Sequence, residues 1–352
     1  MNKFSPDYQN IVDAAKNVEA KRLPIYEHVI SFETIEEITG KSIIPLFESN
    51  DPADINEFFR IYCGFFRDMG YDTVSFERCI VEILPGGGAL GDCRIDPVIK
   101  TREDFENYPW AELPDMYFEK NRRYFTALRD QMPAGMKAIG GVGNGIFECV
   151  QDLTNYTKLA YMQVEEPDLY ADLFKAVGKT NYAIWKRFLK EFEDVFCALR
   201  FGDDLGFKTN TLISYDNIRT HIIPQYKPII NEVHSYGKPF LLHCCGKIFN
   251  VMDDLIAVGI NAKHSNEDQI AKFDVWVESY GNKIGNFGGV DLNAICFLDS
   301  KALREYVLEV LKCCKGNGGI AFGSGNSIPN YVPVQGYMTM IETVREARGD
   351  LA

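Results

Sequence analysis

Two potential metal ligands stand two positions apart at the end of a short apolar run. Residues 239–243 are predicted to form a strand, and Cys244, Cys245 and Gly246 follow it. Because side chains alternate along a strand, His243 and Cys245 are expected to share one side, and Cys244 to face a layer of helices. A neutral imidazole and a thiolate are both preferred zinc donors. The spacing indicates a metal site; the alternative is a packed histidine beside buried thiols.

Carboxylates follow two other apolar runs. Asp203 and Asp204 come directly after residues 195–201, and Glu267 follows residues 260–264. Side chains of this kind orient ligands, bind metals or transfer protons at a reaction centre. They also cap helices and turns at such positions, and the sequence leaves both roles open.

These side chains need elements that bring them together, and the chain alternates short apolar runs with helix-like stretches almost throughout. Such alternation is typical of parallel βα units. Eight runs favour a (β/α)8 TIM barrel over an open sheet. The predicted strands are residues 23–26, 71–76, 137–142, 195–201, 239–243, 260–264, 284–288 and 319–323.

The active site of such a barrel lies at the carboxyl ends of its strands. Polar side chains occur at or just after most of the predicted ends: His28, Glu77, Asp203, Asp204, His243, Cys245, Glu267, Asp268, Asp291 and Asn326. The candidate catalytic residues in this set are Asp203, Asp204, Glu267 and Asn326.

We expect residues 1–352 to form a single domain. Residues 77–133 are more than one βα unit requires, and they include Pro85 followed by three glycines. This segment is therefore predicted to be an irregular insertion or lid after the second strand. Its aromatic side chains either pack in the core or line a ligand pocket; they are Tyr108, Trp110, Tyr117 and Phe118.

Composition narrows the class of protein. The 352 residues carry 37 basic and 50 acidic side chains, a net charge of −13, which argues against a nucleic-acid partner. No stretch approaches the roughly 18 apolar residues of a transmembrane helix, so no membrane partner is expected. The first residues lack the apolar core of a signal peptide, and the 10 cysteines are therefore expected to be the reduced thiols of a cytoplasmic protein.

Several segments resemble the uroporphyrinogen decarboxylase superfamily. They are residues 201–207 (FGDDLGF), 212–214 (LIS), Pro224, 234–237 (HSYG), 242–246 (LHCCG) and 323–329 (GSGNSIP), with Val332 and Pro333 after them. The resemblance covers roughly residues 130 to 345 well and the preceding third of the chain weakly. It implies a (β/α)8 barrel, in agreement with the strand pattern.

The resemblance is closer to the zinc- and corrinoid-dependent methyltransferases of this superfamily than to its true decarboxylases. The methyltransferases carry a His-x-Cys pair, matched by His243 and Cys245, and a distant cysteine whose place Asn326 takes. Asparagine is a poor zinc ligand. The resemblance therefore implies a further ligand from Glu267 or from the pair 203–204, or else a site without zinc.

The true decarboxylases hold porphyrinogen carboxylates with an arginine-rich segment that follows an Arg-x-Pro element. Arg22 and Pro24 match that element, but residues 26–31 contain no arginine. A net charge of −13 also suits a polyanionic substrate poorly.

The resemblance thus implies a zinc-dependent methyltransferase or demethylase that moves a methyl group between a small methylated substrate or thiol and a separate corrinoid protein. One zinc ion would be held by His243, Cys245 and Glu267. The partner protein would supply the methyl-corrinoid, because the sequence shows no corrinoid-binding region. The alternatives are a uroporphyrinogen-type decarboxylase and a non-catalytic barrel that binds a small molecule, which Asn326 favours.

Overall fold

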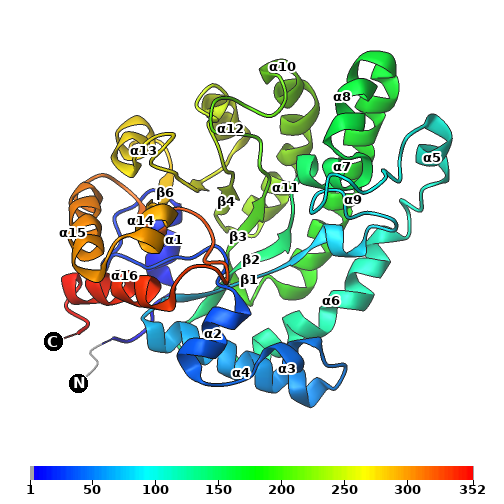
Figure 1. Cartoon of the computed structure of the whole chain (residues 1–352). Coiled ribbons are helices and arrows are strands. Elements are labelled where there is room, and N and C mark those ends of the chain that lie inside the picture. Colours follow the sequence, from blue (N-terminus) through cyan, green and yellow to red (C-terminus); the bar gives the residue numbers. More distant parts are fainter. Residues whose placement is uncertain (1–3, 352) are drawn as a thin grey trace.

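The computed structural model describes residues 4–351 and shows a curled parallel sheet with helices around it (Figure 1). Its seven strands neighbour one another in the order of the sequence, and all six pairs are parallel. The strands are β1 (Thr73–Cys79), β2 (Lys137–Gly143), β3 (Phe196–Gly202), β4 (Phe240–His243), β5 (Ala262–His264), β6 (Gly285–Val290) and β7 (Ile320–Ser324). This confirms the expected α/β, TIM-barrel-like fold.

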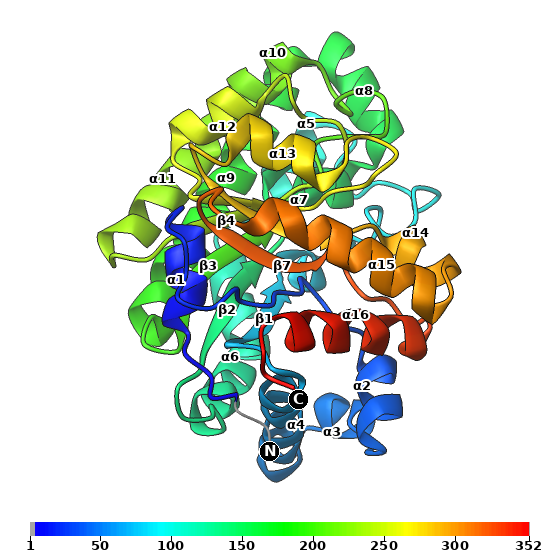
Figure 2. The same ribbon diagram turned by 90° about the vertical axis from the view of Figure 1, so that its left-hand side faces the viewer.

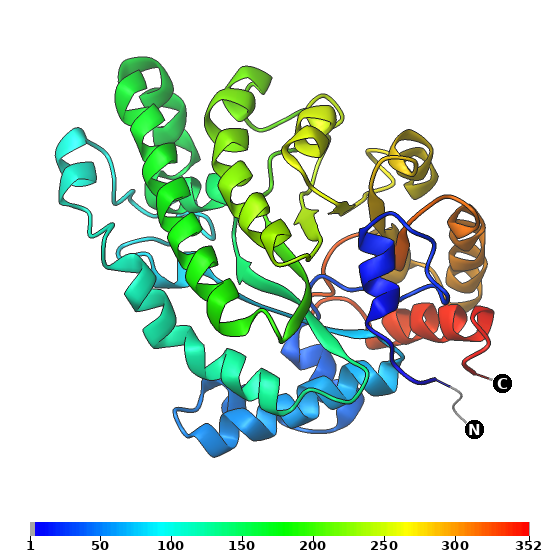
Figure 3. The ribbon, with the colours of Figure 1, turned by 180° about the vertical axis from the view of Figure 1, so that it is seen from behind.

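Helices fill the connections between strands and cover the outer face of the sheet (Figure 3). The α-helices are α1 (Gln9–Ala15), α2 (Phe32–Thr39), α3 (Ile44–Glu48), α4 (Pro52–Met69), α5 (Arg102–Asn107), α6 (Leu113–Asp130), α7 (Ile146–Thr154), α8 (Tyr156–Glu165), α9 (Pro167–Phe192), α10 (Tyr215–Asn217), α11 (Ile223–Ser235), α12 (Met252–Val258), α13 (Phe273–Tyr280), α14 (Leu292–Phe297), α15 (Ser300–Leu311) and α16 (Val334–Ala347). Short turns of other helix types are η1 (Ile80–Ile83), η2 (Ile218–Ile222) and η3 (Lys312–Cys314).

Most residues of the strands are buried, because helices cover one face of the sheet and side chains fill the other. All seven residues of β3 are buried. On its outer face, Phe188 of α9 packs edge-on against Phe196, with ring centroids 5.2 Å apart. Such packing fixes the register of β3 and hence the direction of the residues that follow it.

Helix α1 closes the amino-terminal end of the barrel (Figure 2). The carbonyl oxygen of Ala14 lies so close to Gly285 and Gly319 that a Cβ on either glycine would overlap it. These glycines stand at the start of β6 and just before β7. The carboxyl ends of the strands therefore form the open end, where polar side chains can reach a ligand.

The predicted first strand, residues 23–26, forms only an isolated bridge to β7 instead of a strand. The backbone N–H of Tyr26 donates to Phe322 O at 2.9 Å, whereas Pro24 has no N–H with which to extend a ladder. Towards β1 this segment is held by a side chain: Ser75 Oγ donates to His28 O at 2.6 Å. Within residues 4–351 the sheet consequently stays open between residues 24–30 and β1, an opening we call the seam.

The segment between β1 and β2 contains both irregular and regular structure. Turn η1, a loop and the short helix α5 come first, and the 18-residue helix α6 then leads back to β2. Tyr117 and Phe118 of α6 are buried in the main hydrophobic cluster. A role of residues 77–133 as a lid remains a prediction. In the part of the chain described, no helix is long and apolar enough to cross a membrane.

The close contact between Tyr26 and β7 can be tested by substituting a glycine of that strand. A Cβ on Gly323 would overlap the carbonyl oxygen of Tyr26, so Gly323→Ala is expected to lower the free energy of unfolding by about 1–3 kcal/mol. Gly64, inside α4, has its nearest neighbouring atom 3.9 Å from such a Cβ, so Gly64→Ala is expected to raise it by about 0.5–1 kcal/mol. Chemical denaturation measures both free energies, and an unchanged free energy of unfolding in Gly323→Ala would contradict the close approach of residue 26 to β7.

Candidate functional site

Two glycines bring together the loops that follow β3 and β4. Gly246 has a positive φ of 85°, and a Cβ there would overlap the backbone of Gly206. A side chain at Gly246 would therefore push the two loops apart. Between them, the N–H of Asp203 donates to His243 O at 3.0 Å. This close approach places Asp204 beside Cys245.

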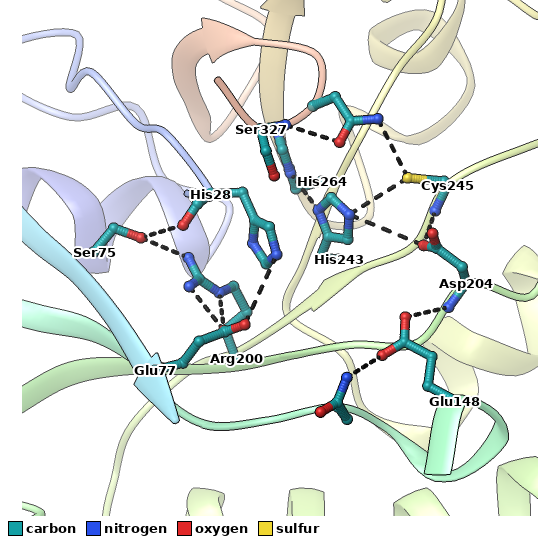
Figure 4. A network of polar contacts seen from close by, with 12 residues as sticks. His28, Ser75, Glu77, Glu148, Arg200, Asp204, His243, Cys245, His264 and Ser327 are labelled. Carbon is teal, nitrogen blue, oxygen red and sulfur yellow. Dashed lines mark hydrogen bonds and ion pairs between the residues drawn. The ribbon is translucent and has the colours of Figure 1, made fainter. Parts of the chain in front are cut away.

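Asp204, His243 and Cys245 form a group whose potential ligand atoms all lie within 4.8 Å of one another (Figure 4). His243 Nε2 is 3.4 Å from Cys245 Sγ and 3.9 Å from Asp204 Oδ1. The N–H of Cys245 donates to the same Oδ1 at 2.8 Å. Tetrahedral zinc with bonds of about 2.0–2.3 Å separates its ligand atoms by roughly 3.3–3.8 Å. The three side chains therefore fit a zinc ion with little rearrangement.

A hydrogen-bonded chain sets the tautomer of His243. His264 Nε2 lies 3.0 Å from the carbonyl oxygen of Ser324, which can only accept, so this nitrogen carries the proton. Nδ1 of the neutral His264 ring then accepts from His243 Nδ1–H at 2.8 Å. The lone pair of His243 is left on Nε2, the atom that faces Cys245 and Asp204. A metal-binding histidine needs this arrangement.

Burial determines the charge states of these groups. It lowers the pKa of His264 to about 3 and holds the pKa of His243 well below its usual range, so both rings are neutral. Burial raises the pKa of the Asp204 carboxyl, and burial together with the nearby Asp204 charge raises that of the Cys245 thiol. A bound divalent cation would favour the ionised forms of both acidic groups.

Asp203, adjacent in sequence to Asp204, has a different role in the structure. It is fully buried, and its carboxylate accepts hydrogen bonds from the N–H groups of Phe147 and Glu148, in the first turn of α7, and from the hydroxyl of Tyr226. Burial raises its pKa to about 6. These contacts make Asp203 the cap of α7, and they direct it away from the group formed by residues 204, 243 and 245.

Asn326 and Glu267 differ in their relation to this group. Asn326 Nδ2 donates to Cys245 Sγ at 3.5 Å, and its Oδ1 accepts from the N–H of Ser327. Its donor therefore faces the sulfur, and its oxygen is engaged elsewhere. Glu267 belongs to neither cluster of three potential ligands found among residues 4–351. In this geometry Asp204 occupies the position for which Glu267 was expected, and the ligand role of Glu267 remains a prediction.

Glu148 lines the same space, although the sequence did not single it out. Its Oε2 accepts from Asn144 Nδ2 at 2.8 Å, and its Oε1 accepts from the N–H of Asp204 at 3.2 Å. A Cβ on Gly202 would lie 3.6 Å from His243 Cδ2 and 3.8 Å from Glu148 Oε1, so the glycine leaves room between them. Burial and nearby carboxylates raise the pKa of Glu148, which favours a protonated group able to donate to a substrate.

A buried ion pair lies on the other side of His243. Arg200 is fully buried and donates through Nε and Nη2 to Glu77 Oε2, at 3.0 and 2.8 Å. The ring of His28 stacks on that of His243 with centroids 3.8 Å apart, and its Nε2 is 4.0 Å from Glu77 Oε1. Alternation along β3 places Arg200, Gly202 and Asp204 on one side. The same alternation that aligned residues 243 and 245 could therefore have identified Arg200 from the sequence.

The loop that carries Asn326 is held by a buried carboxyl group. Ser324 Oγ donates to Asn326 O at 2.6 Å, so its single proton is used there. Glu27 Oε1 accepts from the N–H of Ser324 at 2.9 Å, and Glu27 Oε2 contacts Ser324 Oγ. A protonated Glu27 satisfies this second contact by donating to Oγ. Burial raises the pKa of Glu27 to about 8, in agreement with this assignment.

This assignment predicts how stability depends on pH. Because the pKa of Glu27 rises from 4.5 to about 8 on folding, its contribution is fully present below pH 4.5 and is lost as pH rises towards 8. The limiting slope is about 1.4 kcal/mol per pH unit. Glu27→Gln keeps both hydrogen bonds without titrating, so its stability curve should be flatter between these limits. The exposed control Glu37→Gln should follow the wild type; equal slopes in all three proteins would contradict the assignment.

The tautomer of His243 is open to direct measurement. In nitrogen-15 NMR spectra of metal-free protein labelled at histidine, His243 should carry its proton on Nδ1 and a lone pair on Nε2. His264→Phe removes the acceptor, so His243 should shift towards a mixture of tautomers. His221→Gln, which changes a histidine outside the chain of hydrogen bonds, should leave the signal unchanged. A proton on Nε2 in the wild type would overturn the derivation.

Known structures share this fold at low sequence identity. A methyltransferase from Methanosarcina mazei has a TM-score of 0.70 and 13% identity, over 96% of this chain and 98% of that one. A B12-independent methionine synthase from Shewanella sp. W3-18-1 has a TM-score of 0.52 and 12% identity, over 84% and 87% of the two chains. These similarities show the fold alone. A search of curated protein sequences gives no match.

A comparison with models of protein families identifies the family of this chain. The model for uroporphyrinogen decarboxylase (URO-D) matches residues 66–347, which include β1 to β7 and the side chains of the candidate site from Glu77 to Asn326. The resemblance found in the sequence is thereby confirmed. The chain belongs to the uroporphyrinogen decarboxylase family.

Proposed function

We propose that this chain is a zinc-dependent methyltransferase that exchanges a methyl group between a small methylated substrate or thiol and a corrinoid carried by a separate protein. The proposal depends on one observation: Asp204, His243 and Cys245 converge with spacings suited to zinc, and the hydrogen bond to His264 turns a lone pair of His243 towards them. The fold shared with a methyltransferase supports it.

The side chains present have distinct roles in this proposal. His243, Cys245 and Asp204 would hold the ion and leave a fourth position open to substrate. Zinc would act as a Lewis acid that makes an ether oxygen or amine a better leaving group, or keeps a thiol ionised. Asn326 Nδ2 donates to Cys245 Sγ and so orients the sulfur. Glu148, whose pKa burial and nearby carboxylates raise, would give a proton to the group that loses the methyl.

The observed geometry also bears on the decarboxylase alternative. Within residues 4–351, Arg22 pairs with Asp72, at the amino-terminal start of β1, and Arg200 pairs with Glu77. Neither guanidinium is therefore free to neutralise the carboxylates of a porphyrinogen. The non-catalytic alternative makes a different prediction, which is the absence of turnover with any methyl donor and a corrinoid acceptor.

Metal analysis tests the proposed site. We expect about one zinc per wild-type chain, and loss of zinc in His243→Ala and Cys245→Ser. Asp204→Asn should weaken zinc binding at least about tenfold in competition with a chelator, since one anionic ligand is lost. The exposed Cys93→Ser is the matched control and should bind zinc normally. Wild-type protein without zinc, or full zinc content in the His243 and Cys245 variants, would refute the proposed zinc site.

Methyl transfer itself is measured by adding methyl ethers, methylamines or thiols together with reduced or methylated cobalamin. The change in the corrinoid absorption spectrum reports the transfer. Activity should require zinc and should fall at least about tenfold in Glu148→Gln if that carboxyl donates a proton. A gene for a corrinoid protein next to the gene of this chain would support a partner supplied in trans.

A further inference from the structure

The sulfur of Cys245 has two hydrogen-bonding neighbours besides the groups that would share a metal ion with it. Asn326 Nδ2 donates to Cys245 Sγ at 3.5 Å, and Ser265 Oγ lies 3.6 Å from the same sulfur. A cysteine that binds a metal ion has lost its proton, so in that state the Ser265 hydroxyl is the donor. Among residues 4–351 neither donor has another acceptor, so both serve the sulfur.

A buried lysine holds Ser265, the first residue after β5. Lys263 is only 4% exposed, and its Nζ donates to Ser265 O. The same ammonium lies 3.8 Å from the ring centroid of Trp276, in α13, which is a favourable cation–π contact. Within the part of the chain described, no carboxylate forms an ion pair with Lys263. Its charge is therefore used to fix the loop that carries the Ser265 hydroxyl.

Asn326 stands where the related zinc-dependent methyltransferases carry a cysteine. The asparagine leaves Cys245 as the single thiol of the group formed by residues 204, 243 and 245, and it places a donor where a second sulfur would be. Cys244, the preceding thiol, accepts from the N–H of Leu205 instead. Any reaction at a ligand sulfur of this group would therefore take place at Cys245.

A ligand thiolate is itself a nucleophile at a site that handles methyl groups. Methylation of Cys245 would form an S–C bond from a sulfur lone pair, while the bond between the methyl carbon and its carrier breaks and leaves its electron pair on the carrier. The product would be a thioether, which no longer carries the negative charge that holds a zinc ion. Hydrogen bonds to a thiolate engage its remaining lone pairs and lower their reactivity.

We propose that Ser265 and Asn326 protect Cys245 from methylation, because their donors engage the sulfur lone pairs that the ion leaves free. Lys263 is a positioning residue that acts through Ser265. This inference rests on the proposed methyl transfer and adds to it the residues that keep the methyl group off a metal ligand.

Methylation of the sulfur can be measured without a corrinoid or a substrate. The zinc-loaded full chain would be treated with iodomethane, and peptide mass spectrometry would follow S-methylation of Cys245 relative to the exposed Cys93 of the same chain. The double variant Ser265→Ala with Asn326→Leu lacks both donors and should methylate Cys245 at least about tenfold faster than the wild type. The rate at Cys93 should be the same in both proteins.

The role of Lys263 is tested by combining substitutions. Lys263→Met keeps an apolar chain against Trp276 and removes the ammonium, so it should also speed methylation of Cys245. Added to Ser265→Ala, it should give no further increase, because the hydroxyl through which it acts is already absent. A further increase in that double variant would overturn the positioning role.

A neighbouring serine supplies the matched control. Ser327 follows Asn326, and in the described residues its hydroxyl makes no contact with Cys245, so Ser327→Ala should methylate as the wild type does. Thermal unfolding would verify that every variant is folded, and rates would be compared at equal zinc content. Equal rates at Cys245 in the wild type and in the variant without both donors would overturn the inference.

Zinc analysis of the same samples distinguishes this inference from the proposed function. Protein that holds zinc and transfers methyl groups, but whose Cys245 reacts equally fast with and without the two donors, would refute the protective role alone. Wild-type protein without zinc would refute both, because the Cys245 sulfur would then have no ion to keep it ionised. Slow methylation of wild-type Cys245 together with full zinc content and no methyl transfer would refute the methyltransferase and leave a protected zinc thiolate.

Discussion

One buried ion pair holds together the parts of the barrel that strand pairing does not join. Arg200 of β3 binds Glu77 and Ser75 of β1, and through Nη1 it also binds Tyr26 of the segment on the far side of the seam, at 2.7 Å. Removing one partner of a buried pair commonly costs about 3–5 kcal/mol, because the other charge is left uncompensated. In this chain the loss would also remove the contact that joins β3 to Tyr26, on the far side of the seam.

The candidate metal group depends indirectly on the same ion pair, because Arg200 holds the segment that carries His28. His28 follows Tyr26 and stacks on His243, so the position of the segment limits where that imidazole can lie. His264 and Ser324 approach His243 from β5 and β7 and fix which nitrogen is protonated. The imidazole of the proposed zinc group is thus held by contacts from the segment 24–30, from β5 and from β7.

The sequence predicts some of this arrangement and not the rest, for identifiable reasons. Alternation along a strand aligned His243 with Cys245, and the βα pattern predicted the barrel. The choice between Asp204 and Glu267 depends on how two loops meet at Gly206 and Gly246, which no local pattern encodes. The first run was predicted as a strand from its composition, but it makes only an isolated bridge to β7, and a side chain holds it to β1.

An incompletely paired barrel does not resist motion equally around its circumference. Edges without ladder hydrogen bonds open at lower free energy than paired strands, which open only with global unfolding. At the seam, β1 can separate from residues 24–30 by breaking side-chain contacts while its pairing with β2 remains intact. Backbone amides that face the seam should therefore exchange with solvent well before those between β2 and β3. The barrel thus contains a place that opens locally while the pairing of the seven strands stays intact.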